Sequence, residues 1–245
     1  MRPELFDDNH SAWLSGLPPY TPLPPLRGAA TADIAVIGGG ITGVSTAWHL
    51  SERYPDRRVV LLEARALANG ASGRSGGQVL NGINGIEPRD AALGQRVFAA
   101  TCAGIDIVEA LAARSALDCG FSRRGCLEIY TTEGSAASAQ ARVETWRSWG
   151  LPMRWLPASA VGLHGAFGAV LDPSAGRVNC AALLRGLRPA LLERGVAIHE
   201  QTPVLSIADG ETLTLSTPEG SLRAAAAVLA RFVVICLRAM SAKKG

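Results

Sequence analysis

The feature that most constrains the fold is a glycine turn between two short apolar segments. Residues 34–37 read Ile-Ala-Val-Ile and residues 59–62 read Val-Val-Leu-Leu, and short apolar runs rich in β-branched residues are typical of buried parallel strands. The first run ends at three consecutive glycines, and apolar residues then recur at helical spacing from Ile41 to Arg53. Strand, glycine turn, helix and strand in this order predict a βαβ unit with two adjacent parallel strands.

The glycines have the spacing of a dinucleotide-binding turn, Gly38-x-Gly40-x-x-Gly43. In such a turn the first glycine allows the tight bend, the second lets a pyrophosphate approach the backbone, and the third lets the helix pack closely on the strand. The N–H groups of Ile41 and Thr42 at the start of the helix would face the phosphates, together with the positive end of the helix dipole. This turn therefore predicts binding of an adenine dinucleotide.

The second predicted strand is followed by an acid, Glu63, which lies 20 residues after Gly43. A carboxylate at this place accepts hydrogen bonds from the ribose hydroxyls of adenosine and repels a 2′-phosphate. NADP is therefore disfavoured. The βαβ unit alone does not separate FAD from NAD.

A second glycine-rich loop begins seven residues after Glu63 and reads Gly70-Ala-Ser-Gly-Arg-Ser-Gly-Gly-Gln78. This loop resembles that of the D-amino-acid-oxidase-like (DAO) flavoprotein family, most closely the γ-glutamylputrescine oxidase branch, in which G-A-S-G-R-N-G-G-Q follows the ribose acid. Ser75 stands where that pattern has Asn. Small residues allow a close backbone approach, and the arginine supplies donors to an anion.

The resemblance implies that FAD is the cofactor and that this loop follows its pyrophosphate and ribityl chain. It also implies that the backbone of Val204 meets the adenine. The loop residues to which the resemblance gives a cofactor contact are Ser72, Arg74, Ser75, Gly76 and Gly77.

The resemblance covers residues 33–230 and also implies an architecture. We expect an α/β fold, with a Rossmann-like FAD/NAD(P)-binding domain and a partial α+β substrate domain. The expected division is an extended, Pro-rich N-terminal arm (1–32), an FAD-binding domain in two parts (33–109 and 177–230), a partial substrate domain (110–176) and a tail outside the family pattern (231–245).

The function implied by the resemblance is oxidation of a small-molecule amine or amino acid by hydride transfer to the flavin N5. Members of the family are substantially longer, and much of their substrate pocket comes from sequence that would follow residue 230. No catalytic residue can therefore be assigned. Two hypotheses remain: an FAD-dependent oxidoreductase, or a truncated, non-catalytic dinucleotide-binding remnant of one.

Composition excludes several other classes. With 48% hydrophobic and 18% charged residues the chain is not generally disordered, and a net charge of +3 is too small for a nucleic-acid binder. The five cysteines form no C-x-x-C pair and have no histidine at zinc spacing, which predicts free thiols and no metal site. The acidic N-terminus and the lack of a 20-residue apolar run predict a soluble cytoplasmic protein without a transmembrane segment.

The rest of the chain is predicted to alternate helices and short strands. We expect structural roles for the histidines and for Trp146, Trp149 and Trp155, and a solvated turn at Arg123. The expected helices are 93–111, 135–149 and 180–194, the last one bent at Pro189; the expected strands are 124–132, 196–199, 204–208, 212–216 and 222–229, with 151–179 irregular.

Overall fold

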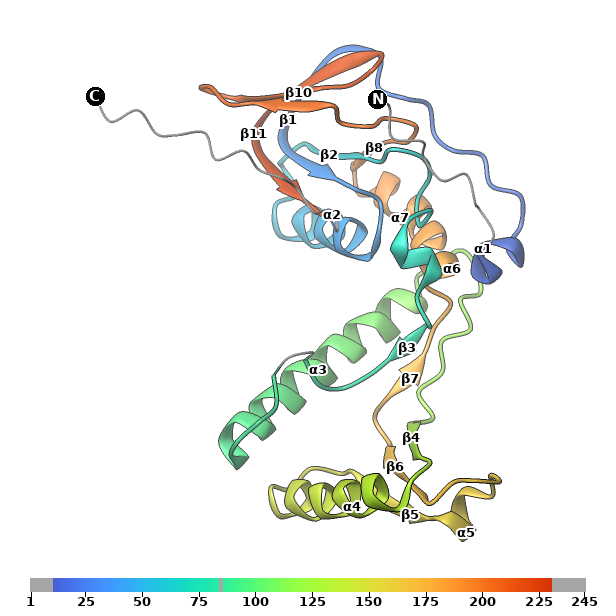
Figure 1. Cartoon of the computed structure of the whole chain (residues 1–245). Helices are drawn as coiled ribbons and strands as arrows, with labels where there is room; N and C mark the ends of the chain where they lie inside the picture. Colours follow the sequence, from blue (N-terminus) through green and yellow to red (C-terminus); the bar gives the residue numbers. More distant parts are fainter. Residues whose placement is uncertain (1–10, 84–85, 231–245) are drawn as a thin grey trace. The chain divides into compact units, whose positions relative to one another are not determined.

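The computed structural model describes residues 11–83 and 86–230, which form two compact units (Figure 1). We call one the central-sheet unit; it contains Pro18–Ser72 and the described residues from Ala190 onward. The other, the α3–α4 unit, contains Gly73–Pro189 and the described residues up to Leu17. These boundaries differ from the predicted division into FAD-binding and substrate domains at 109/110 and 176/177, which stays a prediction.

The central-sheet unit is built on a six-stranded sheet of order β8-β2-β1-β11-β10-β9. The first four strands are parallel, and β10 and β9 continue the sheet as antiparallel neighbours. The predicted βαβ unit is confirmed: Ile34 pairs with Val59 and Ile37 with Leu62 in a parallel ladder. The bounds are β1 Gly28–Ile37, α2 Ile41–Arg53, β2 Val59–Leu62, β8 Ala197–His199, β9 Ser206–Ala208, β10 Leu213–Ser216 and β11 Gly220–Leu229.

The core of this unit lies around β1 and β2. All four residues of β2 are buried, as is typical of a parallel strand that is covered on both faces. Helix α2 packs on β1 and β2 and turns Val44, Ala47 and Trp48 inward at helical spacing. The hydrophobic pattern of the sequence therefore determines both the sheet order here and the face that α2 presents.

Strand β1 is longer than predicted. We expected an extended arm through residue 32, but the strand begins at Gly28, and its first residues pair with β11 from Gly28↔Gly220 onward. The sequence gives little indication of a strand at residues 28–32, because these residues are mostly small and do not alternate between apolar and polar. A ten-residue partner strand supplies the hydrogen bonds that extend β1 backward.

The α3–α4 unit has a three-stranded antiparallel sheet of order β4-β6-β5, covered by α4, and a separate two-stranded sheet of β3 and β7. Its elements are α1 Ala12–Ser15, the 3₁₀ helix η1 Ala71–Arg74 at its boundary, β3 Gln78–Val79, α3 Ala91–Ala112, β4 Cys126–Tyr130, α4 Glu133–Ser148, β5 Arg154–Pro157, α5 Ala158–Val161, β6 Gly168–Asp172, β7 Gly176–Arg177 and α6 Cys180–Gly186, with α7 Arg188–Glu193 crossing into the other unit.

The prediction that residues 151–179 are irregular was wrong, because β5, β6 and β7 lie in this range. These strands have two to five residues and are flanked by Pro and Gly, so they show no readable period. Gly168 on β6 has no room for a side chain. A Cβ there would lie 2.1 Å from the ring of Trp155, which covers this position from the neighbouring strand β5.

Helix α3 is long and apolar enough to cross a membrane, by length and composition alone. A helix of a soluble protein passes the same test, so this is weak evidence. In the described part of the chain no other helix passes it. The apolar stretch at residues 224–237, too short to span a membrane, lies partly in β11 and partly outside the described residues.

The first prediction concerns the contact that fixes α2 on the sheet. A Cβ at Gly43 would lie 1.7 Å from the carbonyl oxygen of Gly38, whereas one at Gly104 on α3 would meet nothing within 4 Å. Gly43→Ala should therefore lower the free energy of unfolding by about 2 kcal/mol or more. Gly104→Ala should leave it unchanged or raise it by up to about 1 kcal/mol. Urea titration of both variants measures this, and equal midpoints would contradict the packing argument.

Candidate nucleotide-binding site

The glycine turn lies between the end of β1 and the start of α2. Gly38 has φ of 111°, a conformation that favours glycine, and its N–H donates to the carbonyl of Leu62 at 2.8 Å. Gly43 packs directly over the Gly38 carbonyl, which is the close helix–strand contact predicted for it. The turn is therefore held from both sides by backbone contacts that a side chain would prevent.

Gly40 is the N-cap residue of α2 and, having no side chain, forms no capping hydrogen bond itself. The N–H of Ile41 donates to the Ser72 hydroxyl at 2.9 Å, and Thr42 is exposed in the first turn. A Cβ at Gly40 would lie 2.7 Å from that same hydroxyl oxygen. The absence of a side chain at Gly40 therefore admits the Ser72 hydroxyl to the start of α2.

Glu63 follows β2 and turns its carboxylate toward the glycine turn. One oxygen accepts from the N–H of Gly39 at 2.5 Å and the other from the N–H of Arg65 at 2.9 Å. A carboxylate has about four acceptor positions, so capacity remains for ribose hydroxyls. Burial raises the pKa of Glu63, with a smaller contribution from nearby Glu200, while the backbone N–H donors oppose the shift.

Two residues that interact with Glu63 were not identified from the sequence. Gly39 donates to Glu63, and a Cβ there would lie 2.6 Å from a methyl group of Leu67. Glu200 is fully buried beside this loop. The three consecutive glycines were a signal for the first, whereas an isolated acid after a short strand gave none for the second.

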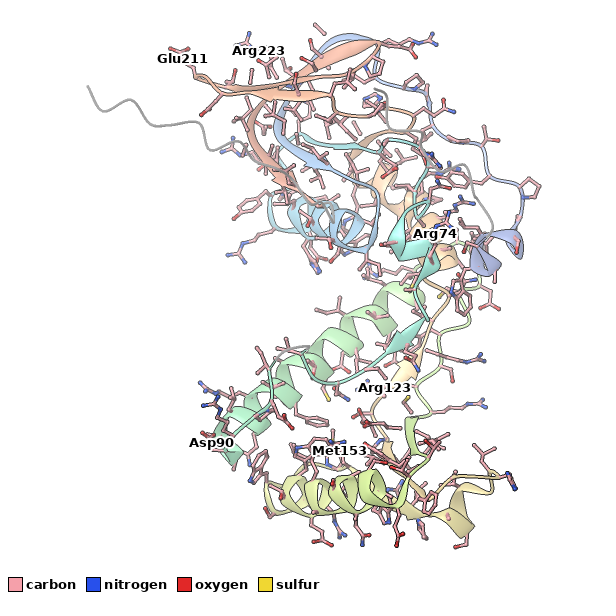
Figure 2. All side chains as sticks on the ribbon, viewed as in Figure 1. Arg74, Asp90, Arg123, Met153, Glu211 and Arg223 are labelled. Atoms are coloured by element: carbon pink, nitrogen blue, oxygen red, sulfur yellow. The ribbon has the colours of Figure 1, made fainter. Side chains whose placement is uncertain are left out.

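The part of the second glycine loop that lies in the α3–α4 unit is built around Ser75 and Gly77. The carbonyl of Ser75 accepts from the indole N–H of Trp13 at 2.6 Å. Gly77 has φ of 70°, and a Cβ there would lie 2.5 Å from the carbonyl of Val178. Arg74 and Gly76 are exposed. The glycines thus permit a tight backbone path through this loop, in which Arg74 lies (Figure 2).

The other residues singled out in the sequence pack in the core, form ion pairs or are free thiols. Val204 packs against the hydrophobic core of the central-sheet unit. Arg123, expected in a solvated turn, instead forms ion pairs with Asp106 at 2.6 Å and Glu109 at 3.2 Å on α3 (Figure 2). Trp146 and Trp155 pack against the buried cluster of Ala139, Val143 and Val170. Cys102, Cys119, Cys126 and Cys180 are free thiols, and Cys236 lies outside the described residues.

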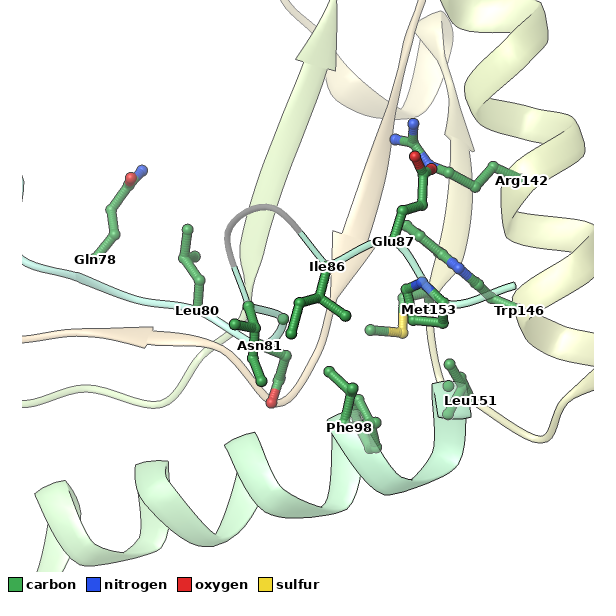
Figure 3. A pocket seen from close by; sticks show the side chains of 15 residues that line it. Gln78, Leu80, Asn81, Ile86, Glu87, Phe98, Arg142, Trp146, Leu151 and Met153 are labelled. Carbon is green, nitrogen blue, oxygen red and sulfur yellow. The ribbon is translucent and has the colours of Figure 1, made fainter. Parts of the chain in front are cut away.

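The α3–α4 unit contains a pocket of about 730 Å³ (Figure 3). Its lining is mostly apolar, with the charged side chains of Glu87 and Arg142 and the amides of Gln78 and Asn81. The guanidinium of Arg142 stacks over Trp146 at 5.0 Å and donates to the Tyr130 hydroxyl at 2.6 Å. Such a lining suits a small ligand with an apolar body and a polar end. The apolar lining residues include Leu80, Ile83, Ile86, Val97, Phe98, Leu151 and Met153.

A parallel sheet, a glycine turn opening a helix and an acid after the next strand define a dinucleotide-binding protein of the Rossmann type. Comparison with known proteins agrees. The profile of the DAO family, described as FAD dependent oxidoreductase, matches residues 33–242. This chain belongs to the DAO family of FAD-dependent oxidoreductases. The match includes most of the segment 231–245, which we expected to lie outside the family pattern.

Two curated relatives illustrate the likeness. Gamma-glutamylputrescine oxidoreductase of Escherichia coli K12 is 32% identical over 230 residues, covering 88% of this chain and 51% of the relative. Glycine oxidase of Geobacillus kaustophilus is 26% identical over 206 residues, covering 81% of this chain and 54% of the relative. The chain therefore spans about half the length of the curated relatives that it matches.

Solved structures show the same fold. The crystal structure of glycine oxidase from Geobacillus kaustophilus has a TM-score of 0.71 at 25% identity, covering 82% of this chain and 55% of that chain. The structure of L-amino acid deaminase from Proteus myxofaciens has a TM-score of 0.68 at 22% identity. The predicted family, fold class and FAD cofactor are confirmed at the level of the family.

The second prediction concerns Glu63 and pH. Its raised folded-state pKa means that the folded chain keeps a proton that the unfolded chain releases above its ordinary value of 4.5. The Glu63 contribution to stability therefore falls as pH rises from about 4.5 through the raised pKa. Glu63→Gln removes this dependence.

The measurement is urea unfolding at several pH values between 4.5 and 7.5. The difference between the unfolding free energies of wild type and Glu63→Gln should decrease as the pH rises. Glu193→Gln, at an exposed carboxylate, is the control and should follow the wild type at every pH. A constant difference between wild type and Glu63→Gln would contradict the assignment.

Proposed function

We propose that the chain binds FAD and serves in the oxidation of a small amine or amino acid. The observation that carries the proposal is the coincidence of Glu63, the glycine turn that opens α2 and the family match. The names of two relatives, gamma-glutamylputrescine oxidoreductase and glycine oxidase, support an amine or amino acid as the substrate class.

The residues of the central-sheet unit fit the ADP part of the cofactor. Gly38, Gly40 and Gly43 add no side chains of their own to the turn. The positive end of the α2 dipole favours an anion there, and the Ile41 N–H donates to the Ser72 hydroxyl. Glu63 presents an acceptor for the ribose hydroxyls and would repel a 2′-phosphate. Val204 is proposed to meet the adenine through its backbone, on the basis of the family resemblance.

The loop that follows Ser72 is proposed to serve the rest of the cofactor, again on the basis of the resemblance. Arg74 is exposed and offers a fork of donors to a phosphate. A Cβ at Gly76 would meet nothing within 4 Å, so a cofactor could approach its backbone closely, whereas Gly77 is covered by the Val178 carbonyl. The Ser75 hydroxyl donates to the Cys180 sulfur at 3.3 Å, and a cofactor contact of Ser75 rests on the resemblance alone. FAD, when bound, supplies the group that accepts the hydride from the substrate. The protein residues named here bind and orient; none of them is assigned a proton transfer.

The third prediction tests cofactor binding. Glu63→Ala should weaken FAD binding by about tenfold or more, because hydrogen bonds to a charged acceptor are worth about 1.5–3 kcal/mol each. Gly40→Val should weaken it further, since its side chain would collide with the Ser72 hydroxyl and occupy the phosphate site. Titration followed by flavin fluorescence measures both. Glu219→Gln, at an exposed acid on the β10–β11 turn, is the control and should bind FAD as the wild type does. Wild-type titration curves for both Glu63→Ala and Gly40→Val would contradict the assignment of the site.

The fourth prediction separates the two functional hypotheses. The chain, reconstituted with FAD, should reduce the bound flavin when an amine or amino acid is added without oxygen, as seen by bleaching near 450 nm, a property of the cofactor. Candidate substrates are glycine, γ-glutamylputrescine and a panel of L-amino acids. Binding of FAD with no bleaching by any member of the panel would favour the non-catalytic dinucleotide-binding alternative.

A further inference from the structure

We propose that Glu200 is a positioning residue that anchors the N-terminal arm and the loop after β2, and thereby sets the adenosine end of the cofactor site. The proposal rests on the proposed FAD function and assigns a role in it to Glu200 and to the N-terminal arm. Glu200 follows β8 and is 0% exposed. A fully buried carboxylate is costly unless its oxygens are satisfied by donors, so the donors identify what it holds.

The donors come from two separate segments of the central-sheet unit. The Tyr20 hydroxyl lies 2.9 Å and 3.0 Å from the two carboxylate oxygens, and the N–H of Leu23 donates to one of them at 2.7 Å. The N–H of Leu67 donates to the other at 2.6 Å. One carboxylate therefore connects the Pro-rich arm with the loop that follows Glu63.

The neighbouring backbone strengthens this connection. Thr202 N–H donates to the carbonyl of Glu63 at 2.8 Å, and Glu63 N–H donates to the carbonyl of His199 at 2.8 Å. The Thr202 hydroxyl accepts from the N–H of Leu26 at 3.1 Å. The arm, the end of β8 and the end of β2 are thus held together at the carboxyl ends of parallel strands, where open α/β sheets bind ligands.

The contact with Leu67 links this anchor to the glycine turn. Leu67 is fully buried, and its side chain fills the space over Gly39, where a Cβ would lie 2.6 Å from it. Gly39 in turn donates to the Glu63 carboxylate at 2.5 Å. Loss of the Glu200–Leu67 hydrogen bond would free Leu67 to move. Gly39 would then lose its packing partner, and the Glu63 carboxylate that it binds would be less well positioned.

A carboxylate suits this place better than an amide. Both oxygens of Glu200 accept, one from Leu67 and the other from Leu23, and Tyr20 bridges them. A glutamine would turn its NH₂ group toward one of these N–H donors, because only one end of its amide accepts. Glu200→Gln therefore changes the acceptor pattern at almost constant volume.

The experiment measures ADP binding by calorimetry, because ADP probes the adenosine end alone. Glu200→Gln should weaken ADP binding about tenfold, and Tyr20→Phe, which keeps both backbone donors, about threefold. Glu219→Gln, an exposed acid paired with Arg27 at 3.0 Å, should bind as the wild type does. Hydrogen exchange of the Leu67 and Leu23 amides should become faster in Glu200→Gln, which reports the anchor directly and without ligand.

A pH profile separates positioning from general stability. Glu200 is the charged side chain that raises the pKa of Glu63 electrostatically, and Tyr20 donates to Glu200. Arg65 and His199 contact Glu63 through their backbone groups. ADP affinity of the wild type should fall as the pH is lowered through the Glu63 titration, and Glu200→Gln should move that fall to lower pH because one negative charge is removed. A variant that is only less stable would keep the wild-type profile.

The outcomes are distinguishable. If the wild type binds neither ADP nor FAD, the proposed function fails and this inference fails with it. If the wild type binds ADP and Glu200→Gln binds it equally well with the same pH profile, only the positioning role of Glu200 is overturned. If Glu200→Gln does not fold, Tyr20→Phe decides: unchanged affinity together with unchanged exchange at Leu67 refutes the proposal.

Discussion

The packing of Gly43 on the carbonyl of Gly38 is the contact on which the candidate site depends. It brings the start of α2 so close to the end of β1 that no Cβ can be accommodated. This closeness places the helix N-terminus at the carboxyl edge of the sheet, where Gly40 adds no side chain and the Ile41 N–H donates to the Ser72 hydroxyl. The same edge receives Glu63 from β2 and Glu200 from β8, so the sheet order β8-β2-β1 assembles the site.

The sequence predicted the parts of this arrangement that depend on local pattern. The bounds of α2 and β2 agree with the predicted ones, because a glycine turn and two apolar runs leave few alternatives. The division of 180–194 into α6 and α7 follows from Pro189, as expected. Residues 28–32 and the strands within 151–179 were missed, because their pairing depends on partners distant in the sequence rather than on their own period.

Glu200 shows why a site cannot be read completely from local pattern. In the sequence it is one acid among others after a short strand, and its spacing matches no motif. Its carboxylate accepts from Tyr20 and Leu23, more than 170 positions away, and from Leu67, 133 positions away. Only the folded chain brings Tyr20, Leu23 and Leu67 to one carboxylate. By contrast, Glu63 could be assigned because its distance from the glycine turn is set by one helix and one strand.

Two buried or half-buried acids so close together would ordinarily destabilise the fold, since burial and mutual repulsion both disfavour the charged forms. Here each carboxylate is surrounded by backbone N–H donors: Gly39 and Arg65 at Glu63, and Leu23 and Leu67 at Glu200. The electrostatic cost of the acid pair is thus offset by hydrogen bonds from the N-terminal arm and from the segments after β1 and β2. Under the proposed function these segments hold the adenosine end of the cofactor, so the order of the arm would be coupled to cofactor affinity.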